Sequence, residues 1–507
     1  MLLKIRKRYY PKMKDFPMHL NKCDFSSPKS LEQYAKQLEG MTFREVLDLG
    51  IAPEGIDREY NSKRYKGGMG TLIEERFFGY KSNSDQEPDF ADAGVELKAS
   101  CMNIKKDGSY AAGERLVLTM IPFNKPIEDD FYSSHVWSKS EKILLIYYER
   151  DKFRDSYDQV IKYVKLITPT KEDLRIIRED YDKIVSIVKA GKAEDLSESL
   201  TSYLGACTKG ATADSSWVEQ YYPPHSMAKR RAFCFKRSYM DYILHAYMIG
   251  DRSLAESIVK DSNVLEKMTF EEYVLSLLEP HFGKTDKELC KLIGKEYSGN
   301  KAQWNQIVYA LLGVKGDRAE EFEKANISVR TVRIEKHGVI RESLSLDTFN
   351  FKDIVVQNWT DSKLKAYFEE TRFLFVSFKK TDDEIVLSGA RFWSMSNEDI
   401  EGKLKDCWER TKDVVSEGVE LTVSLDKNGK AKISNNLPKL TDPGSIAHVR
   451  PHTAKRGYRL EDGTEYGYPD KYGDELPDGR VMTQQSFWLN NGYVYGIVSL
   501  DEGEERL

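Results

Sequence analysis

Apolar and charged residues alternate along Val95–Ala99, with Glu96 and Lys98 at the charged positions. Successive side chains of a strand point to opposite faces, so this pattern predicts a strand that carries both charges on one face. The preceding segment Gly70–Gly79 spaces its apolar residues as a helix does and includes Glu74. We therefore expect a helix followed by a strand, with charged side chains brought close together.

The other patterns of the first half alternate between strands and helices. Lys105–Gly108 is a turn signal, and we expect the apolar run Leu116–Ile121 after it to form a hairpin-like pair with the Glu96 strand. The remaining predicted elements are a short helix at 42–50, a strand at 142–148, a helix at 171–189, a loop ending near Lys209, a strand near Phe233 and a helix at 239–248. Together they predict a mixed α/β domain.

The second half repeats the first half weakly and in the same order. The paired segments are Leu311–Lys315 with Phe77–Lys81, Phe322–Arg330 with Phe90–Lys98, Arg372–Phe378 with the strand after Lys139, Ala447–His452 with the loop ending at Lys209, and Phe487–Tyr493 with Phe233–Tyr239. We therefore expect two tandem copies of one α/β fold. The expected division is a first domain at 1–255, a helical connector at 256–300 and a second domain at 301–507.

Length and composition bound the class of protein. A chain of 507 residues suggests two to three domains, each with its own core. Its six cysteines are scattered without a C-x-x-C pair, so neither a zinc site nor a disulfide framework is indicated. No apolar run approaches the roughly 18 residues of a membrane span, and the basic N-terminus lacks the apolar region of a secretory signal. We expect a cytoplasmic protein with no membrane partner.

Four residues form the pattern E-x14-D-x6-E-x-K, namely Glu74, Asp89, Glu96 and Lys98. Mg²⁺ prefers hard oxygen ligands and is typically held by one or two carboxylates together with water and phosphate oxygens. Asp89 and Glu96 are the expected ligands, and Glu74 would complete the outer shell or hold a second ion. Lys98 can orient or deprotonate the attacking water and offset charge on the phosphorus. The set predicts metal-dependent cleavage of a phosphodiester.

The alternative to catalysis is a solvated edge strand. E-x-K alone carries no information in a chain with 31% charged residues, and Glu401–Lys403 shows the same pattern. The N-terminal pattern is distinguished by its context, since an aspartate follows Pro88, the strand alternates, and a helix-like segment carries Glu74. Spacing alone leaves both interpretations open.

The stretch from Lys66 to Ser100, which holds the four residues above, resembles MutH, the GATC-nicking mismatch-repair endonuclease. It resembles still more the GATC-cleaving type II restriction endonucleases that are built on a MutH-like fold. The resemblance covers essentially the whole chain. Ser134–Lys139 before an apolar run resembles the family segment with a second active-site lysine, which nominates Lys139. Arg178–Tyr181 and Tyr203–Lys209 resemble the segment that places a base-reading lysine in the major groove, which nominates Lys209. The implied fold is a restriction-endonuclease-like mixed sheet.

Basic residues are concentrated in two segments, although the net charge is −5. Local patches matter more than the sum for phosphate contacts. The predicted DNA-binding residues are Lys209, Lys229, Arg230, Arg231, Lys236 and Arg237 in the first half, and Arg450, His452, Lys455 and Arg456 in the second. Either segment alone could be an ordinary solvated face, but two in matching places favour DNA as the partner.

The two halves differ at the candidate site. In the alignment of the halves, Glu74 becomes Val308, Asp89 becomes Glu321, Glu96 becomes Ser328, Lys98 becomes Arg330 and Lys139 becomes Glu369. Without the Glu96 carboxylate, the second copy is not expected to hold a metal ion. We expect it to be catalytically degenerate and to bind DNA as an effector of the first copy.

The combined prediction is a type II deoxyribonuclease of a restriction-modification system that makes Mg²⁺-dependent double-strand cuts at duplex 5′-GATC. A second DNA site on the C-terminal copy and a dimer formed on DNA are further expectations. The reading loop holds Cys207–Lys209 where family nickases have Arg-Pro-Lys, and Cys234 replaces the tyrosine that senses adenine methylation. The alternatives are a repair-type GATC nickase and a non-catalytic GATC-binding regulator.

Overall fold

The computed structural model describes residues 23–49, 59–61, 67–81, 87–209, 216–251, 255–300, 302–425, 427–429 and 431–499. The chain divides into two compact units. Unit 1 comprises residues 1–113 and 137–168, and unit 2 comprises residues 114–136 and 169–507. These boundaries differ from the expected division at 255 and 300. A division by compactness does not compare the folds of the two halves, so the predicted domains stay a prediction.

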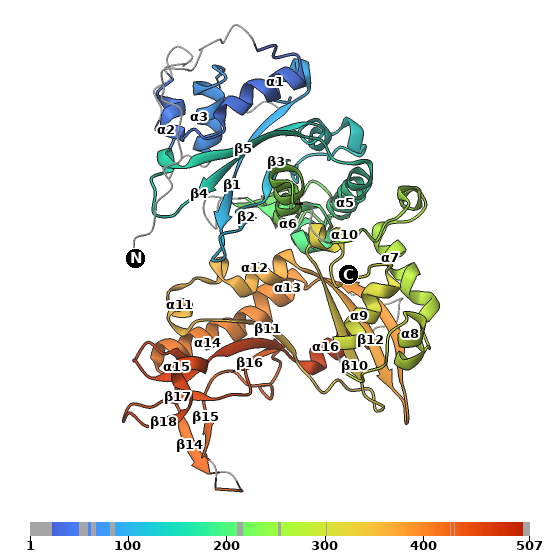
Figure 1. The fold of residues 1–507 in the computed structure, drawn as a ribbon, viewed down its shortest axis with the longest axis vertical. Helices are drawn as coiled ribbons and strands as arrows, with labels where there is room; N and C mark the ends of the chain where they lie inside the picture. Colours follow the sequence, from blue (N-terminus) through green and yellow to red (C-terminus); the bar gives the residue numbers. More distant parts are fainter. Residues whose placement is uncertain are drawn as a thin grey trace, which may run out of the picture. The chain divides into compact units, whose positions relative to one another are not determined.

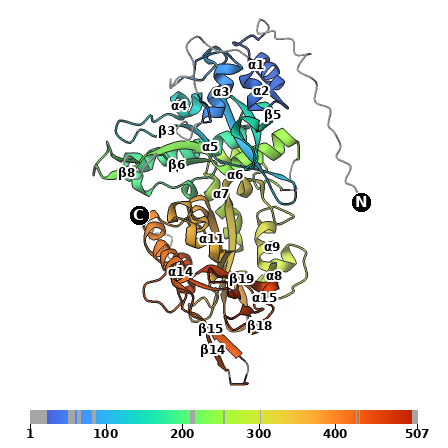
Figure 2. The same ribbon diagram turned by 90° about the vertical axis from the view of Figure 1, so that its left-hand side faces the viewer.

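Unit 1 contains a four-stranded mixed sheet in the order β2-β1-β4-β5. Strand β1 (Glu96–Ile104) runs parallel to β4 (Ile143–Arg150), whereas β2 (Tyr110–Ala112) and β5 (Val160–Ile167) are antiparallel to their neighbours. The helices α1 (Pro28–Ala35), α2 (Phe43–Leu47) and α3 (Gly68–Arg76) are grouped beside this sheet (Figures 1 and 2). The expected short helix at 42–50 and the expected helix around Glu74 are confirmed as α2 and α3.

One apolar core joins these helices to the sheet. It includes Leu31 of α1, Leu72 and Ile73 of α3, and Leu144 and Ile146 of β4, all of them fully buried. Strand β4 is apolar on both faces, as expected for a strand that lies inside a sheet with a parallel neighbour. The core therefore fixes α3 and β1, the two elements that carry Glu74, Glu96 and Lys98.

The predicted hairpin between the Glu96 strand and Leu116–Ile121 is wrong. Strand β1 pairs instead with β2, directly after the predicted turn. The chain passes close to β1 at Gly113, where a Cβ atom would lie 2.5 Å from the Cys101 Sγ. Strand β3 (Leu116–Met120) belongs to unit 2, because Leu116 and Leu118 are buried there and the strand pairs with β9 (Arg231–Phe235).

Unit 2 contains several small sheets and most of the helices. Its three-stranded sheets have the orders β3-β9-β6, β10-β12-β13 and β11-β21-β16. Their other strands are β6 (Leu204–Thr208), β10 (Ile327–Ile334), β12 (Arg372–Lys380), β13 (Ile385–Trp393), β11 (Leu344–Thr348), β21 (Gln485–Leu489) and β16 (Ala447–Pro451). The minor sheets comprise β7 (Trp217–Glu219), β8 (Met227–Lys229), β14 (Thr422–Leu425), β15 (Ala431–Ser434), β17 (Gly457–Arg459), β18 (Glu465–Gly467), β19 (Gly473–Glu475) and β20 (Val481–Thr483).

The α-helices wholly in unit 2 are α5 (Lys171–Lys189), α6 (Arg237–Ile243), α7 (Phe270–Leu278), α8 (Asp286–Leu292), α9 (Ala302–Leu311), α10 (Glu320–Ala325), α11 (Phe351–Val356), α12 (Lys363–Glu370), α13 (Asn397–Asp399), α14 (Lys405–Glu417), α15 (Pro469–Tyr472) and α16 (Asn491–Ser499); α4 (His135–Ser138) lies where the chain passes between the units. Helix α5 has the predicted bounds, and its N-cap Thr170 accepts a hydrogen bond from the Asp173 N–H. Helices α7 and α8 confirm the helical character of the 256–300 segment. Within the described residues, no helix is long and apolar enough to cross a membrane.

The sheet β10-β12-β13 has the same pairing as β1-β4-β5. In both, the first two strands are parallel and the third is antiparallel to the second. The register agrees as well, because Glu96 lies opposite Ile143 while Ser328 lies opposite Phe373. Likewise, β11-β21-β16 has the antiparallel pairing of β3-β9-β6. The matching strand pairings agree with the predicted repeat, and two tandem copies of one fold stay a prediction.

Candidate active site

Asp89 and Glu96 lie side by side at the two ends of a short loop in unit 1. The Phe90 N–H donates to the Val95 carbonyl at 2.9 Å, and Gly94 closes the loop with φ of 61°. The Leu97 N–H then donates to the Asp89 Oδ2 at 2.9 Å, and the Asp89 N–H donates to the Glu96 Oε2 at 3.3 Å. The tight loop converts a separation of seven residues into adjacent carboxylates.

Two ammonium groups contact the Glu96 carboxylate. The Lys98 Nζ lies 2.6 Å from the Glu96 Oε1, as expected for neighbours on one face of β1. The Lys139 Nζ lies 3.1 Å from the Glu96 Oε2 and also donates to the Glu87 carbonyl at 3.2 Å. Glu96 itself is only 1% exposed. The structure therefore brings Asp89, Glu96, Lys98 and Lys139 together as the sequence suggested.

Glu74 joins the same group of charges from α3. Burial, together with the charge of Asp89, raises the pKa of Glu74 to about 7. Burial, together with the charge of Glu96, raises the pKa of Asp89 to about 6. Crowded carboxylates disfavour one another's ionisation, and a bound cation relieves that repulsion.

The donor chemistry fits a divalent cation, although the ligands are not assembled around one. Among the described residues, no group of three or more His, Cys, Asp and Glu side chains is arranged to hold a metal ion. The oxygens of Glu96 face the two lysines, and the Asp89 Oδ2 faces a backbone N–H. Because Mg²⁺ needs only one or two protein carboxylates besides water and phosphate oxygens, Asp89 and Glu96 suffice as its protein ligands. Glu74 would complete the outer shell of the cation.

The predicted base-reading residue Lys209 follows β6 in unit 2. It is half-buried, and its N–H donates to the Arg230 carbonyl at 2.8 Å. The Lys229 ammonium lies 5.5 Å from the centre of the Trp217 ring, and Arg230 is exposed. Arg237 is also exposed, with its guanidinium 3.7 Å from the Glu370 carboxylate. Lys209, Lys229 and Arg230 therefore lie near one another, whereas Arg237 lies at the opposite end of the β6–β9 pair, where the Lys236 N–H donates to the Tyr203 carbonyl.

Arg231 and Lys236 face the interior instead. The Arg231 Nη1 donates to the Ala206 carbonyl at 2.9 Å, and the Lys236 Nζ donates to the carbonyls of Thr201 and Ala325 at 2.8 and 2.9 Å. Their exposed fractions are 7% and 2%. This placement counts against the predicted phosphate contacts of both residues. Strand β9 is buried on both faces, which the mixture of basic and aromatic residues over 229–237 did not indicate.

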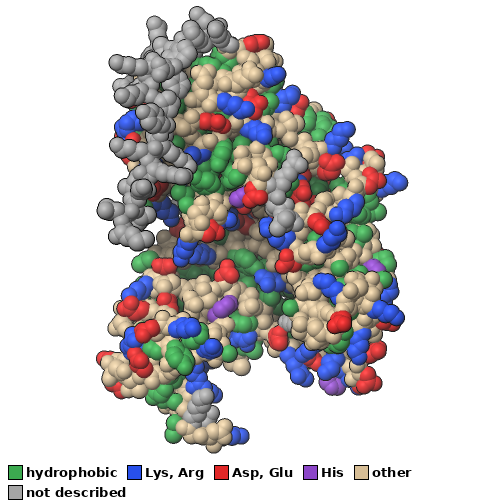
Figure 3. Space-filling model, in the orientation of Figure 1, with side chains coloured by type: hydrophobic (Ala, Val, Ile, Leu, Met, Phe, Trp, Pro, Cys, Tyr) green, Lys and Arg blue, Asp and Glu red, His purple; other side chains and the backbone are tan. Residues whose placement is uncertain are grey.

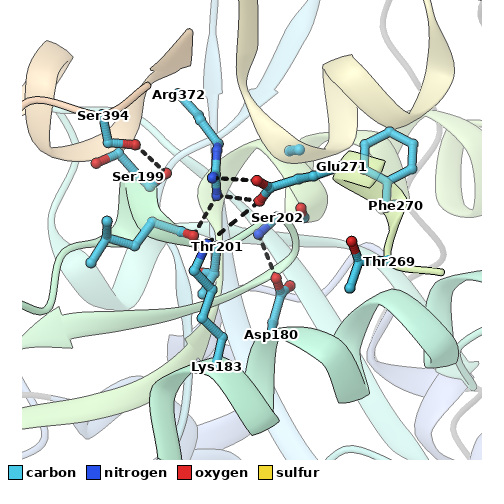
Figure 4. A network of polar contacts seen from close by, with 12 residues as sticks. Asp180, Lys183, Ser199, Thr201, Ser202, Thr269, Phe270, Glu271, Arg372 and Ser394 are labelled. Atoms are coloured by element: carbon cyan, nitrogen blue, oxygen red, sulfur yellow. Dashed lines mark hydrogen bonds and ion pairs between the residues drawn. The ribbon is translucent and has the colours of Figure 1, made fainter. Parts of the chain in front are cut away.

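The start of β6 is held by a residue to which the sequence gave no role. The Asp180 carboxylate accepts hydrogen bonds from the N–H groups of Ser202, Tyr203 and Leu204 at 2.7, 2.6 and 2.9 Å. Figure 4 shows Asp180 pointing from α5 to this segment, and the Arg372 guanidinium facing the Glu271 carboxylate. The sequence signal that could have identified Asp180 is an acidic residue on the apolar face of an amphipathic helix.

The second-half cations lie on or beside β16. The exposed Arg450 guanidinium lies 3.7 Å from the centre of the Trp488 ring, and the His452 Nδ1 lies 2.8 Å from the Ser486 Oγ. Lys455 and Arg456 are exposed. On the face shown in Figure 3, basic side chains alternate with acidic ones and do not form one broad patch. Any phosphate contact would therefore be made locally.

The second-half counterparts of the site form no carboxylate cluster. Val308 is buried in α9, and the Glu321 carboxylate accepts hydrogen bonds from the Ser257 hydroxyl and from the Ile258 and Val259 N–H groups. The Arg330 Nη2 donates to the Tyr367 hydroxyl at 3.0 Å. These side chains serve local packing.

Comparison with known proteins gives three results. The family described as DNA mismatch repair enzyme MutH matches residues 78–180. The Type II restriction enzyme Sau3AI of Staphylococcus aureus is 37% identical over 461 residues, which cover 85% of this chain and 92% of that enzyme. The DNA mismatch repair proteins MutH of Shigella boydii serotype 18 and of Escherichia coli O17:K52:H18 are 30% and 29% identical over 191 residues, covering 37% of this chain and 80% of each relative.

Proposed function

The chain belongs to the MutH-like family of type II restriction enzymes represented by Sau3AI, and from this membership we propose that it cuts both strands of duplex DNA at 5′-GATC with the help of Mg²⁺. It is a type II site-specific deoxyribonuclease. The site residues, the recognised sequence and the identity of the cation belong to the proposal.

The observation that carries the proposal is the Glu96 carboxylate between two ammonium groups, with Asp89 beside it. Asp89 and Glu96 would hold the cation, and Glu74 would accept a proton or support the cation's water shell. When bound, the cation polarises the phosphate and lowers the pKa of a coordinated water. Lys98 orients or deprotonates the attacking water, and Lys139 offsets charge on the phosphate. The protein thereby supplies both ligands and donors for phosphodiester hydrolysis.

Recognition of GATC is proposed for Lys209, which directly follows β6, the strand that stands where a loop was predicted. Lysine and arginine donating to guanine O6 and N7 are the commonest specific contacts in the major groove. Lys229 and Arg230 near Lys209, and Arg237 at the opposite end of β9, are exposed or half-exposed and are proposed to hold phosphates. Arg231 and Lys236 are left out because they are buried.

The second half is proposed to be a degenerate copy that binds DNA and stimulates the first. The matching strand order and register support common ancestry of the two halves. Arg450, His452, Lys455 and Arg456 would contact a second GATC site or the same duplex. Pairing of two chains on DNA would then bring two cutting sites to one palindromic sequence.

The test is a digest of unmethylated phage DNA by the purified protein with Mg²⁺, followed by sequencing of the ends. Uniform ends at GATC are expected. Glu96→Ala should abolish cutting and leave GATC binding in Ca²⁺ intact. Ends at another sequence would overturn the recognition site, and loss of binding in Glu96→Ala would show that Glu96 is structural.

A repair-type nickase is the alternative activity. A nickase acting alone would leave plasmid DNA nicked, whereas the proposed enzyme leaves it linear. The extent of similarity favours double-strand cleavage, because the restriction enzyme matches 85% of this chain and the MutH proteins match 37% of it.

A further inference from the structure

Tyr80 lies at the edge of the candidate active site but has no role in the reaction described above. It follows α3, where Gly79 has a positive φ of 73° and turns the chain back. The Tyr80 N–H donates to the Glu74 carbonyl at 3.2 Å, and its ring meets that of Phe90 edge to face at 5.5 Å. The side chain is thus fixed between the segment that carries Glu74 and the residue next to Asp89.

The Tyr80 hydroxyl is shielded from solvent and has no hydrogen-bond partner among the residues that the structure describes. Two other tyrosines of unit 1 differ in this respect. The Tyr34 hydroxyl donates to the Phe77 carbonyl at 3.3 Å, and the Tyr60 hydroxyl donates to the Glu75 Oε2 at 2.7 Å. A buried donor without an acceptor destabilises the fold, so its presence requires an explanation.

The surroundings of Tyr80 indicate which acceptor is missing. Burial and the charges of Asp89, Glu74 and Glu96 raise the pKa of Tyr80 well above its usual range, so the phenol remains a donor. Because the hydroxyl is shielded from solvent, a side chain of the site reaches it more readily than a DNA phosphate does. The oxygens of Glu96 are already held by Lys98 and Lys139. Within the part of the chain that the structure describes, Asp89 accepts a hydrogen bond through its Oδ2 alone, and it adjoins the residue against which the Tyr80 ring packs.

We propose that Tyr80 is a positioning residue of the cation site, whose hydroxyl donates to the Asp89 carboxylate once a divalent cation draws Asp89 into coordination. The inference rests on the proposed function, since it takes Asp89 as a cation ligand. Ligating carboxylates are commonly held by such a second hydrogen bond, and loss of that bond weakens metal affinity. The unpaired hydroxyl of the cation-free protein is then a donor reserved for the cation-bound state.

The experiment compares Tyr80→Phe with Tyr34→Phe and the unaltered protein. Three quantities are measured: the Tm in EDTA, the rise in Tm on titration with Ca²⁺ or Mg²⁺, and the Mg²⁺ concentration that gives half-maximal cleavage. Tyr80→Phe should leave the Tm in EDTA unchanged or raise it, because it removes an unpaired polar group. It should also weaken cation binding in both titrations by roughly 10-fold or more, with cleavage recovering at high Mg²⁺.

Tyr34→Phe is the matched control, because it removes a hydroxyl that has a partner in the same core. It should lower the Tm in EDTA and leave both cation titrations unchanged. A Tyr80→Phe protein that loses Tm in EDTA as the control does, or that binds cations like the unaltered protein, would overturn the inference. If the unaltered protein neither binds cations nor cuts DNA, the proposed function fails instead.

Discussion

The parallel strand pair β1–β4 in unit 1 and the parallel strand pair β10–β12 in unit 2 have the same register but different side chains. Glu96 and Lys98 stand at the positions where β10 has Ser328 and Arg330. In both pairs, the second strand is largely apolar and buried. In unit 2 the same strand pairing forms without Glu96 and Lys98, and in unit 1 burial, together with neighbouring carboxylates, raises the pKa of Glu74 and of Asp89. Residues kept against such a penalty are candidates for function.

Asp89, which precedes β1, and Glu321, which precedes β10, also differ in their surroundings. Glu321 is satisfied by three donors from Ser257, Ile258 and Val259. Asp89 has one backbone donor on its side chain and lies among other acidic groups. The Glu321 carboxylate therefore holds residues 257–259 in place, whereas the Asp89 carboxylate can accept a cation.

The sharpest test of this difference replaces Lys98 of β1 and, separately, Arg330 of β10. Lys98→Ala should lower the cleavage rate by roughly 10²–10⁴-fold, because it removes the group that orients or deprotonates water. Arg330→Ala should leave the rate of the isolated chemical step unchanged. Single-turnover cleavage of a GATC duplex measures both. Equal losses of cleavage rate in the two variants would contradict the proposal that the first copy is catalytic and the second is degenerate.

The second test concerns how each half holds the strand that leads to its proposed DNA-contacting residues. Strand β6 is held by the buried Asp180 carboxylate, whereas the Ala447 N–H of β16 donates to the neutral Ser445 hydroxyl at 3.3 Å. Asp180→Asn should lower the free energy of unfolding by about 3 kcal/mol, since three charge-assisted hydrogen bonds are weakened and the buried Lys236 ammonium loses a nearby charge. Ser445→Ala should cost about 1 kcal/mol. Urea denaturation provides both values, and a similar small loss in the two variants would contradict the interpretation.

The third test addresses the DNA-binding surface that is proposed for the second half. Changing Arg450 and His452 together to alanine should reduce cleavage of one-site DNA by roughly 5-fold or more, as expected for a loss of coupling between DNA sites. The Mg²⁺ dependence should stay the same, because neither residue belongs to the metal site. Initial rates on one-site and two-site plasmids distinguish these effects. An unchanged rate on both would remove the effector role.

The smallest expected effect is a pH dependence of stability to which Glu74 and Asp89 of unit 1 contribute. Folding raises the pKa of Glu74 from 4.5 to about 7 and that of Asp89 from 3.8 to about 6. A raised carboxyl pKa stabilises the fold at low pH, and this contribution is lost as the pH rises through 6 and 7. In EDTA, Glu74→Gln should reduce the resulting fall in Tm by roughly 2–4 °C. Calorimetry between pH 5 and pH 8 measures the Tm at each pH. A pH dependence of the Tm that is unchanged from that of the unaltered protein would contradict the prediction. Cation affinity should rise over the same interval.

Several predictions from sequence were confirmed because they depended on local patterns. Helix α5 has its predicted bounds, and β1 places Glu96 and Lys98 on one face as alternation required. The pairing partner of Leu116–Met120 was missed, because its buried face belongs to a different sheet and sequence order suggested the nearest strand. The burial of Lys236 was missed for a related reason. Carbonyls at Thr201 and Ala325, which are distant in sequence, satisfy its ammonium group, and no local pattern reports them.

The three hydrogen bonds that Glu321 accepts have a consequence for the history of this chain. If the halves arose by duplication, the carboxylate equivalent to Asp89 has since been recruited to anchor residues 257–259. Reverting Ser328 and Arg330 to glutamate and lysine would therefore not rebuild a nuclease, because freeing Glu321 would release the segment that it anchors. If the second half is the degenerate copy proposed above, these two substitutions alone would not reverse its loss of the cation site, because Glu321 now anchors a neighbouring segment.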